Sequence, residues 1–300
     1  MPSSSGPLLE VVVVTSTGAR DLMPACLGSL RDNPPASGEM VVHVVDNAST
    51  DGTPELVRDR FPEVVLHALD WNSGFCVANN LVLRASHADF VLVLNPDTEV
   101  YEGVLDHMLG VMGEHPDVGM ASCRLAKADG TLDHASKRSF PTPLGALAHF
   151  LRVGRSRLAP RRLAQYRAPE LGEHDAGEVD AVNGAFMLVR REALEDVGLL
   201  DEGYWLYMDD LDWCFRFKRK GWKVWYDGAV TIKHLKGGTT VRNRHRGSRH
   251  NVAFHRSMGR FYRKFYAGER PLVDAAIYVA ILAKLTVSLG RSAIARRSLS

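Results

Sequence analysis

The 300-residue sequence predicts an α/β fold in which a mostly parallel sheet is flanked by helices. Apolar runs at 10–15, 40–45 and 90–94 are too short for core helices and too continuous for half-exposed strands. Each is therefore expected to be a strand buried on both faces. Segments with helical spacing separate these runs, and such alternation favours right-handed crossovers within one parallel sheet.

The elements of the first half follow one another closely. Strands are expected at 10–15, 40–45, 64–69 and 90–94, and helices at 21–30, 54–60 and 72–86. All four strands end in small or polar residues, namely Thr15, Asp46, Asn72 and Asp97. Parallel strands have their carboxyl ends at one edge of the sheet, where open α/β sheets bind ligands. We therefore expect the functional site at this edge.

The second half is less regular. A helix is expected at 101–113, a strand at 118–123 and a hairpin turn at 128–130. An irregular basic loop is expected over 141–176, and loops of this length are commonly functional. A strand at 182–190, helices at 191–197 and 209–220, and short strands at 222–226 and 229–234 follow. We predict one α/β domain over residues 8–245, followed by a basic and amphipathic helical segment over residues 246–300.

Charge and cysteine content restrict the partners and the compartment. The net charge is only +2, but Lys and Arg concentrate between 233 and 270, where Glu269 is the sole acid. Such a surface needs an anionic partner. The stretch has no recognisable nucleic-acid-binding motif, so we do not expect the partner to be a nucleic acid. Four cysteines without a Cys-x-x-Cys pair indicate reduced thiols in a cytoplasmic compartment and argue against zinc. Residues 1–7 lack the apolar core of a signal peptide.

Asn95-Pro96-Asp97 ends the fourth expected strand. Pro96 cannot donate to a sheet ladder, so pairing is expected to stop there. A carboxylate beside an amide on a short turn suits a hard divalent cation that also holds a diphosphate, although the same tripeptide is ordinary turn chemistry. His234 ends another apolar strand. Its imidazole would be a further ligand, and Mn²⁺ accepts nitrogen more readily than Mg²⁺.

A second acidic cluster, Asp209-Asp210-Leu211-Asp212, opens an expected helix. The helix dipole stabilises each carboxylate there by about 0.3–1 kcal/mol, so one of them is explained as a cap. Three carboxylates are more than helix capping requires. The flanking aromatic residues are of the kind on which sugars pack. A carboxylate held ionised there can accept a proton from an attacking hydroxyl. Downstream, the glycine-containing basic stretch 236–249 fits equally a loop that closes over phosphates and a solvated connection.

Five motifs occur in a characteristic order between residues 10 and 266. They are Asp46-Asn47-Ala48-Ser49-Thr50-Asp51-Gly52-Thr53, Asn72-x-Gly74-Phe75-x-x-Ala78-Asn79-Asn80, Asn95-Pro96-Asp97, Asn183-Gly184-Ala185-Phe186, and Asp209-Asp210-x-Asp212 with His234 downstream. Together they resemble the inverting glycosyltransferases of family 2, especially the bacterial rhamnosyltransferase-like branch that builds cell-wall and polysaccharide linkers. The resemblance implies a GT-A fold: a Rossmann-like, mostly parallel sheet flanked by helices, here with a C-terminal helical extension.

The resemblance also implies roles for individual residues. Asp210 matches the catalytic base, and Asp97 with His234 matches the ligands of Mn²⁺ or Mg²⁺. Asn95 stands where the family's Asp-x-Asp motif has its first acid, and Asp209 stands where Glu is usual. The expected donor-binding residues are Thr15, Asp46, Asn72, Gly74, Asn79, Asn95 and Asp97. The expected acceptor-binding residues are Asp209, Asp212, Trp205 and Asn183.

The implied reaction is inverting hexosyl transfer from a nucleotide-sugar donor, best matched by dTDP-L-rhamnose, to a lipid-linked glycan acceptor carrying a polyprenyl diphosphate. A sugar-1-phosphate nucleotidylyltransferase is one alternative, but it calls for a glycine-rich basic loop after the first strand, where 16–20 offers one glycine and one arginine. A non-catalytic, membrane-bound scaffold is the other. The presence of Asp97, Asp210 and His234 together argues against it.

The apolar segment 272–289 suggests how the protein is located. It is barely long enough for a bilayer, which takes about 20 residues. It also contains Asp274 and Lys284, each costing about 2.5–3.5 kcal/mol at the bilayer centre. We therefore expect a helix lying on an anionic membrane surface or forming a homodimer contact, and the neighbouring arginines favour the membrane. The expected location is cytoplasmic, peripheral on the inner face of the cell membrane.

Overall fold

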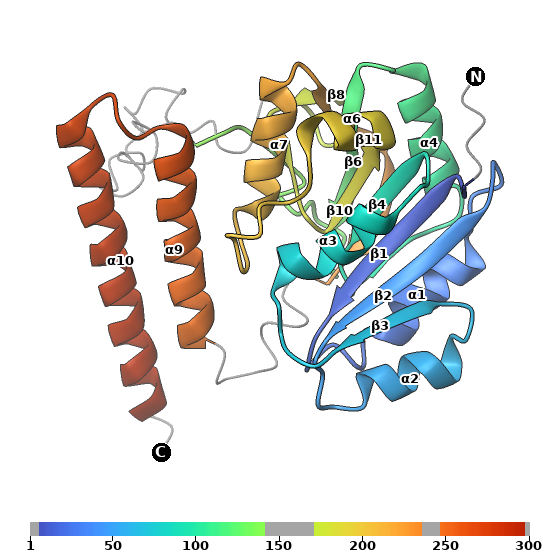
Figure 1. Ribbon diagram of the computed structural model, residues 1–300, viewed down its shortest axis with the longest axis horizontal. Coiled ribbons are helices and arrows are strands. Elements are labelled where there is room, and N and C mark those ends of the chain that lie inside the picture. The colour runs from blue at the N-terminus through green and yellow to red at the C-terminus, as the bar shows by residue number, and fades with distance from the viewer. Residues whose placement is uncertain (1–5, 142–170, 236–246, 298–300) are drawn as a thin grey trace.

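The computed structural model describes residues 6–141, 171–235 and 247–297 (Figure 1). The expected first half is confirmed. Strands β1 (Leu9–Thr15), β2 (Met40–Asn47), β3 (Val65–Leu69) and β4 (Phe90–Leu94) run parallel in the order β3-β2-β1-β4. Helices α1 (Met23–Asp32), α2 (Thr53–Arg60) and α3 (Phe75–Ala85) connect them. The carboxyl ends of these strands therefore lie at one edge.

The sheet continues beyond β4 with strands from the second half. β10 (Phe186–Arg190) lies antiparallel between β4 and β6 (Val118–Ala126), and β11 (Lys223–His234) runs parallel to β6. The short strands β5 (Thr98–Glu99) and β8 (Ala176–Val179) both pair antiparallel with β11. The sheet is thus mixed, with its parallel half next to an antiparallel insertion.

Two strand predictions were wrong in their boundaries. The strand expected at 182–190 is two strands, because Asn183 and Gly184 form a turn between β9 (Ala181–Val182) and β10. β9 pairs with β7 (Lys137–Arg138) in a separate two-stranded sheet. The strands expected at 222–226 and 229–234 are the single strand β11. Its register shifts between Asp227 and Thr231, so Gly228 bends the strand without ending it.

Both faces of the sheet are buried, as the continuous apolar runs predicted. In β4, Leu92 and Leu94 pack toward α1 and α4 (Val104–Glu114), whereas Val91 and Val93 pack toward the opposite layer. That layer contains α3, α6 (Arg191–Val197) and α7 (Asp209–Arg219). Burying each such side chain contributes about 1.5–3 kcal/mol, so the β4 sequence fixes the strand in the centre of the sheet.

Helices α9 (Gly247–Phe265) and α10 (Pro271–Arg297) form a hairpin beside α7 (Figure 1). α9 packs on the α/β part, where the ring centroids of Phe265 and Phe215 are 4.3 Å apart. α10 packs on α9 through Ile277 and Ile281. Most of the expected loops 141–176 and 236–249 lies outside the described residues, although β8 adds a strand at the end of the first.

α10 is longer than the expected segment 272–289. By length and composition alone, Pro271–Gly290 is a candidate membrane span, and only 11% of its apolar window is buried. The charge of Asp274 had argued against a span, but this carboxylate lies in the first turn of α10. There it accepts hydrogen bonds from the Tyr262 hydroxyl at 2.5 Å and the Gly268 amide at 3.0 Å.

Candidate active site

A cleft of about 460 Å³ opens at the carboxyl ends of β1 and β4. It brings together ten of the thirteen residues that the sequence predicted for the site. These are Thr15, Asn72, Gly74, Asn95, Asp97, Asn183, Trp205, Asp209, Asp210 and His234. The expected convergence of polar strand ends at one edge is therefore present in the structure.

One wall of the cleft contains a buried polar atom without a partner. Thr15 Oγ1 at the end of β1 has no hydrogen-bond partner among the described residues. Buried hydroxyls nearly always have a partner, so this one is suited to a bound ligand. Asn72 accepts a hydrogen bond from the Gly74 amide at 3.1 Å, which orders the turn that enters α3.

Two predicted donor residues do not line the cleft. Asp46 is buried and accepts hydrogen bonds from the Ser49 amide, at 2.8 Å, and from the Ser49 hydroxyl, so it orders the turn after β2. Burial raises the pKa of Asp46, and the Ser49 hydrogen bonds oppose that rise. The Asn79 side chain is buried and donates to the Phe75 carbonyl at 2.9 Å within α3. Asn47, the residue after Asp46, lines the cleft instead.

Sheet register brings Asp97 and His234 together. β5 pairs with the end of β11 so that Thr98 lies opposite His234, and the Leu235 amide donates to the Asp97 carbonyl at 2.8 Å. His234 Nε2 is 3.5 Å from Asp97 Oδ1, and Nδ1 is 3.2 Å from Asp133 Oδ2. Burial opposes protonation of His234, but hydrogen bonds to Asp133 and Asp97 outweigh it and raise the pKa to about 9.

This arrangement fits a divalent cation held partly by substrate. In the parts of the chain that the structure describes, no three or more His, Cys, Asp or Glu residues form a complete metal-binding group. Asp97 and His234 Nε2 nevertheless face each other at the cleft. Asp133 holds the other ring nitrogen, as carboxylates commonly do behind histidine ligands. Two protein ligands leave the remaining positions for phosphate oxygens and water, which Mg²⁺ normally retains.

An unusual turn presents the second acidic cluster. Tyr207 and Met208 both have left-handed backbone conformations, with φ of 69° and 65°. Such conformations are costly for residues other than glycine and cluster at functional sites. The turn leads into α7 and brings Asp209 and Asp210 to the cleft. Burial raises the pKa of Asp209, and the neighbouring charge of Asp210 raises it further.

The Asp210 carboxylate is held from several directions. Oδ2 is 2.5 Å from an Arg138 guanidinium nitrogen and accepts from the Gly184 amide at 3.3 Å. Oδ1 accepts from the Leu211 amide at 2.8 Å. Arg138 also donates to the Val182 carbonyl, so β7 and β9 fix its position. Asp210 is therefore a carboxylate held in a fixed orientation at the wall of the cleft.

A model of the family described as Glycosyl transferase family 2 matches residues 11–198, more than half of the chain. The protein belongs to glycosyltransferase family 2. Its fold is GT-A, as the resemblance implied.

Curated relatives of this glycosyltransferase include an enzyme of Mycobacterium tuberculosis named N-acetylglucosaminyl-diphospho-decaprenol L-rhamnosyltransferase. The two are 31% identical over 229 residues, 72% of each chain. Rhamnosyltransferase WbbL of Escherichia coli is 25% identical over 206 residues, covering 63% of this chain and 75% of WbbL. The family assignment and the rhamnosyltransferase-like branch are thereby confirmed.

Solved structures share the fold of the glycosyltransferase at low sequence identity. The mannosyltransferase PcManGT of Pyrobaculum calidifontis, in complex with GDP-Man and Mn²⁺, has a TM-score of 0.56 and 20% identity, covering 98% of this chain and 78% of its own. Residues 1–349 of TarS from S. aureus, in complex with UDP, have a TM-score of 0.54 and 15% identity, covering 90% and 70%. At these identities the likeness shows the fold alone.

Asp212 lies apart from the other two acids of the cluster. Its side chain is fully buried and does not line the cleft, which contradicts its expected place at the acceptor. Asp212 pairs with Arg216 at 2.8 Å and with Lys264 at 2.6 Å. Lys264 also pairs with Asp201 at 2.7 Å. Asp212 therefore joins α7 to α9 in the glycosyltransferase.

We expect Asp212→Ala to lower the free energy of unfolding by about 3–5 kcal/mol, because it leaves two cations without their buried partner. Denaturant titration measures this loss. Asp196→Ala is the matched control, since Asp196 pairs with Lys220 on the exposed surface, where a pair contributes at most about 1 kcal/mol. Equal losses from the two variants would show that Asp212 is not a structural anchor.

Gly74 shapes the cleft by making room for Trp205. Its φ is 87°, and a Cβ there would lie 2.5 Å from Trp205 Cδ1 and 2.6 Å from the Trp205 carbonyl oxygen. The Phe75 amide donates to that same carbonyl at 2.9 Å. Gly74 thus allows the segment carrying Trp205 to dock on the start of α3.

We expect Gly74→Ala to displace Trp205, raise the acceptor KM and lower stability. Gly103→Ala is the control, because Gly103 also has a positive φ, of 75°, but a Cβ there meets nothing within 4 Å. Gly103→Ala carries left-handed backbone strain of about 1–2 kcal/mol. Gly74 has a ψ of 179°, in a region that essentially only glycine occupies, so Gly74→Ala combines backbone strain with the clash. Acceptor kinetics and denaturation distinguish them. An equal rise in acceptor KM for both variants would refute this role for Gly74.

Asp133 and Arg138 were not predicted as site residues from the sequence. Asp133 follows the hairpin turn at 128–130, and Arg138 precedes a stretch rich in arginine, so neither stands out by spacing. Their partners, His234 and Asp210, are 101 and 72 residues away. The two contacts depend on the pairing of β7 with β9 and of β6 with β11, which local sequence does not indicate.

Proposed function

We propose that the protein transfers L-rhamnose from dTDP-L-rhamnose to a hydroxyl of a polyprenyl-diphosphate-linked glycan, with inversion and with Mn²⁺ or Mg²⁺ bound. The observation that carries the proposal is the placement of Asp97, His234 and Asp210 around one cleft at the sheet edge. The name of the Mycobacterium tuberculosis relative supports L-rhamnose as the sugar and a diphosphate-linked isoprenoid glycan as the acceptor. The GDP-Man, Mn²⁺ and UDP of the solved neighbours support a nucleotide-sugar donor and a cation.

The donor would lie along the carboxyl ends of β1 and β4. Thr15 offers its unpartnered hydroxyl to the nucleotide, and Asn95 lines the same wall. Asp97 and His234 would hold the cation, which when bound neutralises the diphosphate and stabilises its departure. Asp133 keeps Nδ1 of His234 engaged, so that Nε2 faces the cation position.

Asp210 would act as the base. The acceptor hydroxyl gives its proton to the Asp210 carboxylate as its oxygen bonds to the anomeric carbon, and the bond from that carbon to the nucleotide diphosphate breaks. Attack from the face opposite the leaving group inverts the anomeric carbon, and no covalent enzyme intermediate forms. Arg138 and the Gly184 amide position the carboxylate. Trp205 and Asp209, which line the same cleft, would contact the acceptor.

Neither alternative function gains support from the structure. Nucleotidylyl transfer needs phosphate-binding amides after β1, but the Gly18 amide there donates to Asp51 at 2.6 Å. A non-catalytic scaffold has no need for Asp210, a carboxylate that Arg138 holds at the wall of a cleft.

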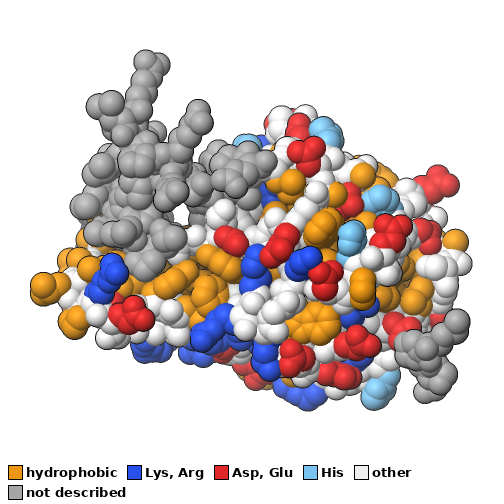
Figure 2. Space-filling model, turned by 90° about the horizontal axis from the view of Figure 1, so that it is seen from above, with side chains coloured by type: hydrophobic (Ala, Val, Ile, Leu, Met, Phe, Trp, Pro, Cys, Tyr) orange, Lys and Arg blue, Asp and Glu red, His pale blue; other side chains and the backbone are white. Residues whose placement is uncertain are grey.

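We further propose that α10 brings the enzyme to the cytoplasmic face of the membrane, where a lipid-linked acceptor is presented. Leu272, Val279 and Leu282 of α10 are 87%, 66% and 64% exposed. Figure 2 shows hydrophobic side chains with Lys and Arg among them at the end of the molecule where the helical hairpin lies. This combination suits an anionic membrane surface. A homodimer contact through the same face is the alternative.

A panel of nucleotide sugars tests the proposal. Purified protein with Mn²⁺ and a GlcNAc-diphosphate isoprenoid receives dTDP-L-rhamnose, UDP-sugars or GDP-mannose, and mass spectrometry identifies the products. We expect dTDP release and one added rhamnose. Transfer from another donor would refute the rhamnose assignment. Pyrophosphate release in a separate reaction supplied with dTTP and a sugar 1-phosphate would favour nucleotidylyl transfer, and no turnover in either reaction would favour the scaffold.

A further inference from the structure

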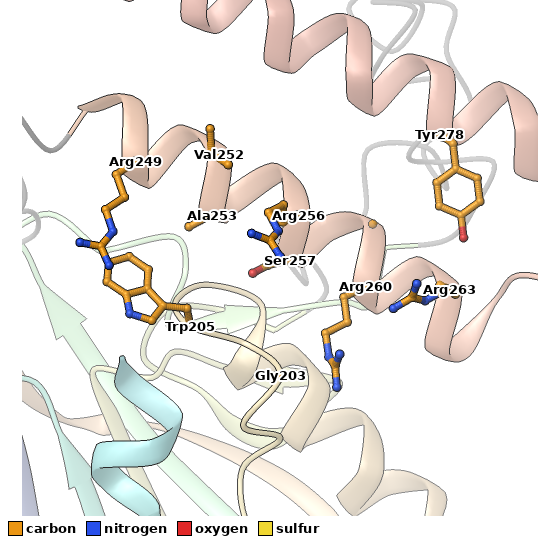
Figure 3. A pocket seen from close by; sticks show the side chains of 11 residues that line it. Gly203, Trp205, Arg249, Val252, Ala253, Arg256, Ser257, Arg260, Arg263 and Tyr278 are labelled. Carbon is orange, nitrogen blue, oxygen red and sulfur yellow. The ribbon is translucent and has the colours of Figure 1, made fainter. Parts of the chain in front are cut away.

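A second cavity, of about 850 Å³, lies between α9 and the segment that carries Gly203 and Trp205 (Figure 3). We call it the arginine groove, after the four arginines of α9 that line it: Arg249, Arg256, Arg260 and Arg263. Trp205 and Arg249 line both this groove and the cleft that holds Asp210, so the two cavities adjoin. At the other end, Tyr278 of α10 completes the lining.

The groove has an excess of positive charge. Arg260 is 2.7 Å from Asp201, and Arg249 lies over the Trp205 ring at 4.5 Å from its centroid. Within the described residues, Arg256 and Arg263 have no carboxylate within salt-bridge distance, and both are exposed. Guanidinium groups offer planar, paired donors that match phosphate oxygens. The groove is therefore suited to a compact group carrying at least two negative charges.

We propose that the arginine groove binds the diphosphate of the isoprenoid-linked acceptor. The inference rests on the proposed function and extends it to the part of the acceptor that does not react. In an acceptor whose sugar is joined directly to diphosphate, the phosphates lie next to the sugar that enters the cleft. The diphosphate site must therefore adjoin the cleft, and the arginine groove does so because Trp205 lines both.

The apolar surface beyond the groove is consistent with the isoprenoid tail. Tyr278 marks the end of the groove on α10, and the adjacent Val279 and Leu282 are largely exposed. A tail leaving the groove there passes from the arginines to an apolar helix face. Phospholipid head groups share the phosphate chemistry, but they meet a protein at its outer face. The concave groove next to the cleft favours the acceptor diphosphate.

The test compares two acceptors in detergent. One is a GlcNAc-diphosphate carrying a short isoprenoid, and the other is an alkyl β-N-acetylglucosaminide without diphosphate. We expect Arg256→Ala and Arg263→Ala each to raise the KM for the diphosphate acceptor about ten-fold or more, as expected for loss of a charge-assisted hydrogen bond. The KM values for the alkyl glycoside and the donor should not change. Arg270→Ala, an exposed arginine of the same hairpin outside the groove lining, is the control.

Two outcomes would overturn the groove proposal. An unchanged KM for the diphosphate acceptor means that its phosphates bind elsewhere. If the same variants lose only their binding to anionic vesicles, the groove binds phospholipid head groups. An equal rise in KM for both acceptors means that the arginines act on the sugar or on the fold.

Direct binding of farnesyl diphosphate, without donor or sugar, distinguishes failure of this inference from failure of the proposed function. Arginine-dependent binding without sugar transfer would refute the function and retain the groove. Transfer to the diphosphate acceptor without arginine dependence would retain the function and refute the groove.

Discussion

Replacing Asp210 with asparagine is expected to lower turnover about 10²–10⁴-fold, the usual contribution of a general base, with donor affinity near the wild-type value. The amide keeps the size of the side chain and can still accept from the Leu211 amide, but it cannot take a proton from the acceptor. Steady-state kinetics with saturating donor measure the fall, and nucleotide binding measured separately shows whether the donor site is intact.

Asp209→Asn is the informative comparison, because Asp209 lies in the same cleft beside Asp210. Its burial and raised pKa favour the protonated form, which is less suited to accept a proton. We expect a smaller loss of turnover from Asp209→Asn. A greater loss from Asp209→Asn than from Asp210→Asn would identify Asp209 as the base.

Removal of Asp97 is expected to have a comparable effect through the cation. Asp97→Ala should lower turnover about 10²-fold or more, because metal stabilisation of a leaving diphosphate contributes several kcal/mol. Added Mn²⁺ should not restore this variant. Asp133→Asn should instead weaken metal affinity about 10–100-fold and recover at high Mn²⁺, because Asp133 acts by holding His234.

Chelation provides the control for these variants. Wild-type protein in EDTA should lose turnover and regain it with Mn²⁺ or Mg²⁺, while its thermal unfolding changes little. Full turnover in EDTA, or recovery of Asp97→Ala by added metal, would contradict a cation on Asp97 and His234.

The sequence indicated the parallel half of the sheet because its signals are local. Strand β4 reads as buried from its own five residues, and Asn95-Pro96-Asp97 marks its end without reference to any partner. Since parallel strands place their carboxyl ends at one edge, Thr15, Asn95 and Asp97 were correctly expected in one cleft. The antiparallel insertion of β10 between β4 and β6 was not predicted, because its short apolar run fits several partners.

Helical spacing explains the error at Asp212. The motif suggested that Asp212 binds the acceptor together with Asp209, but the first turn of α7 directs Asp210 to the cleft and Asp212 toward α9. Arg216, four residues after Asp212, was a visible sign of an ion pair within the helix. Lys264 was not, because it lies 52 residues away on another helix.

The most direct test of a single displacement with Asp210 as base is the configuration of the transferred sugar. Wild-type protein, donor and acceptor are incubated until product accumulates, and the one-bond carbon–hydrogen coupling at the new anomeric centre is measured by NMR. We expect the configuration opposite to that of the donor sugar. A product with the donor's configuration would require two displacements or front-face transfer and would contradict the proposed mechanism.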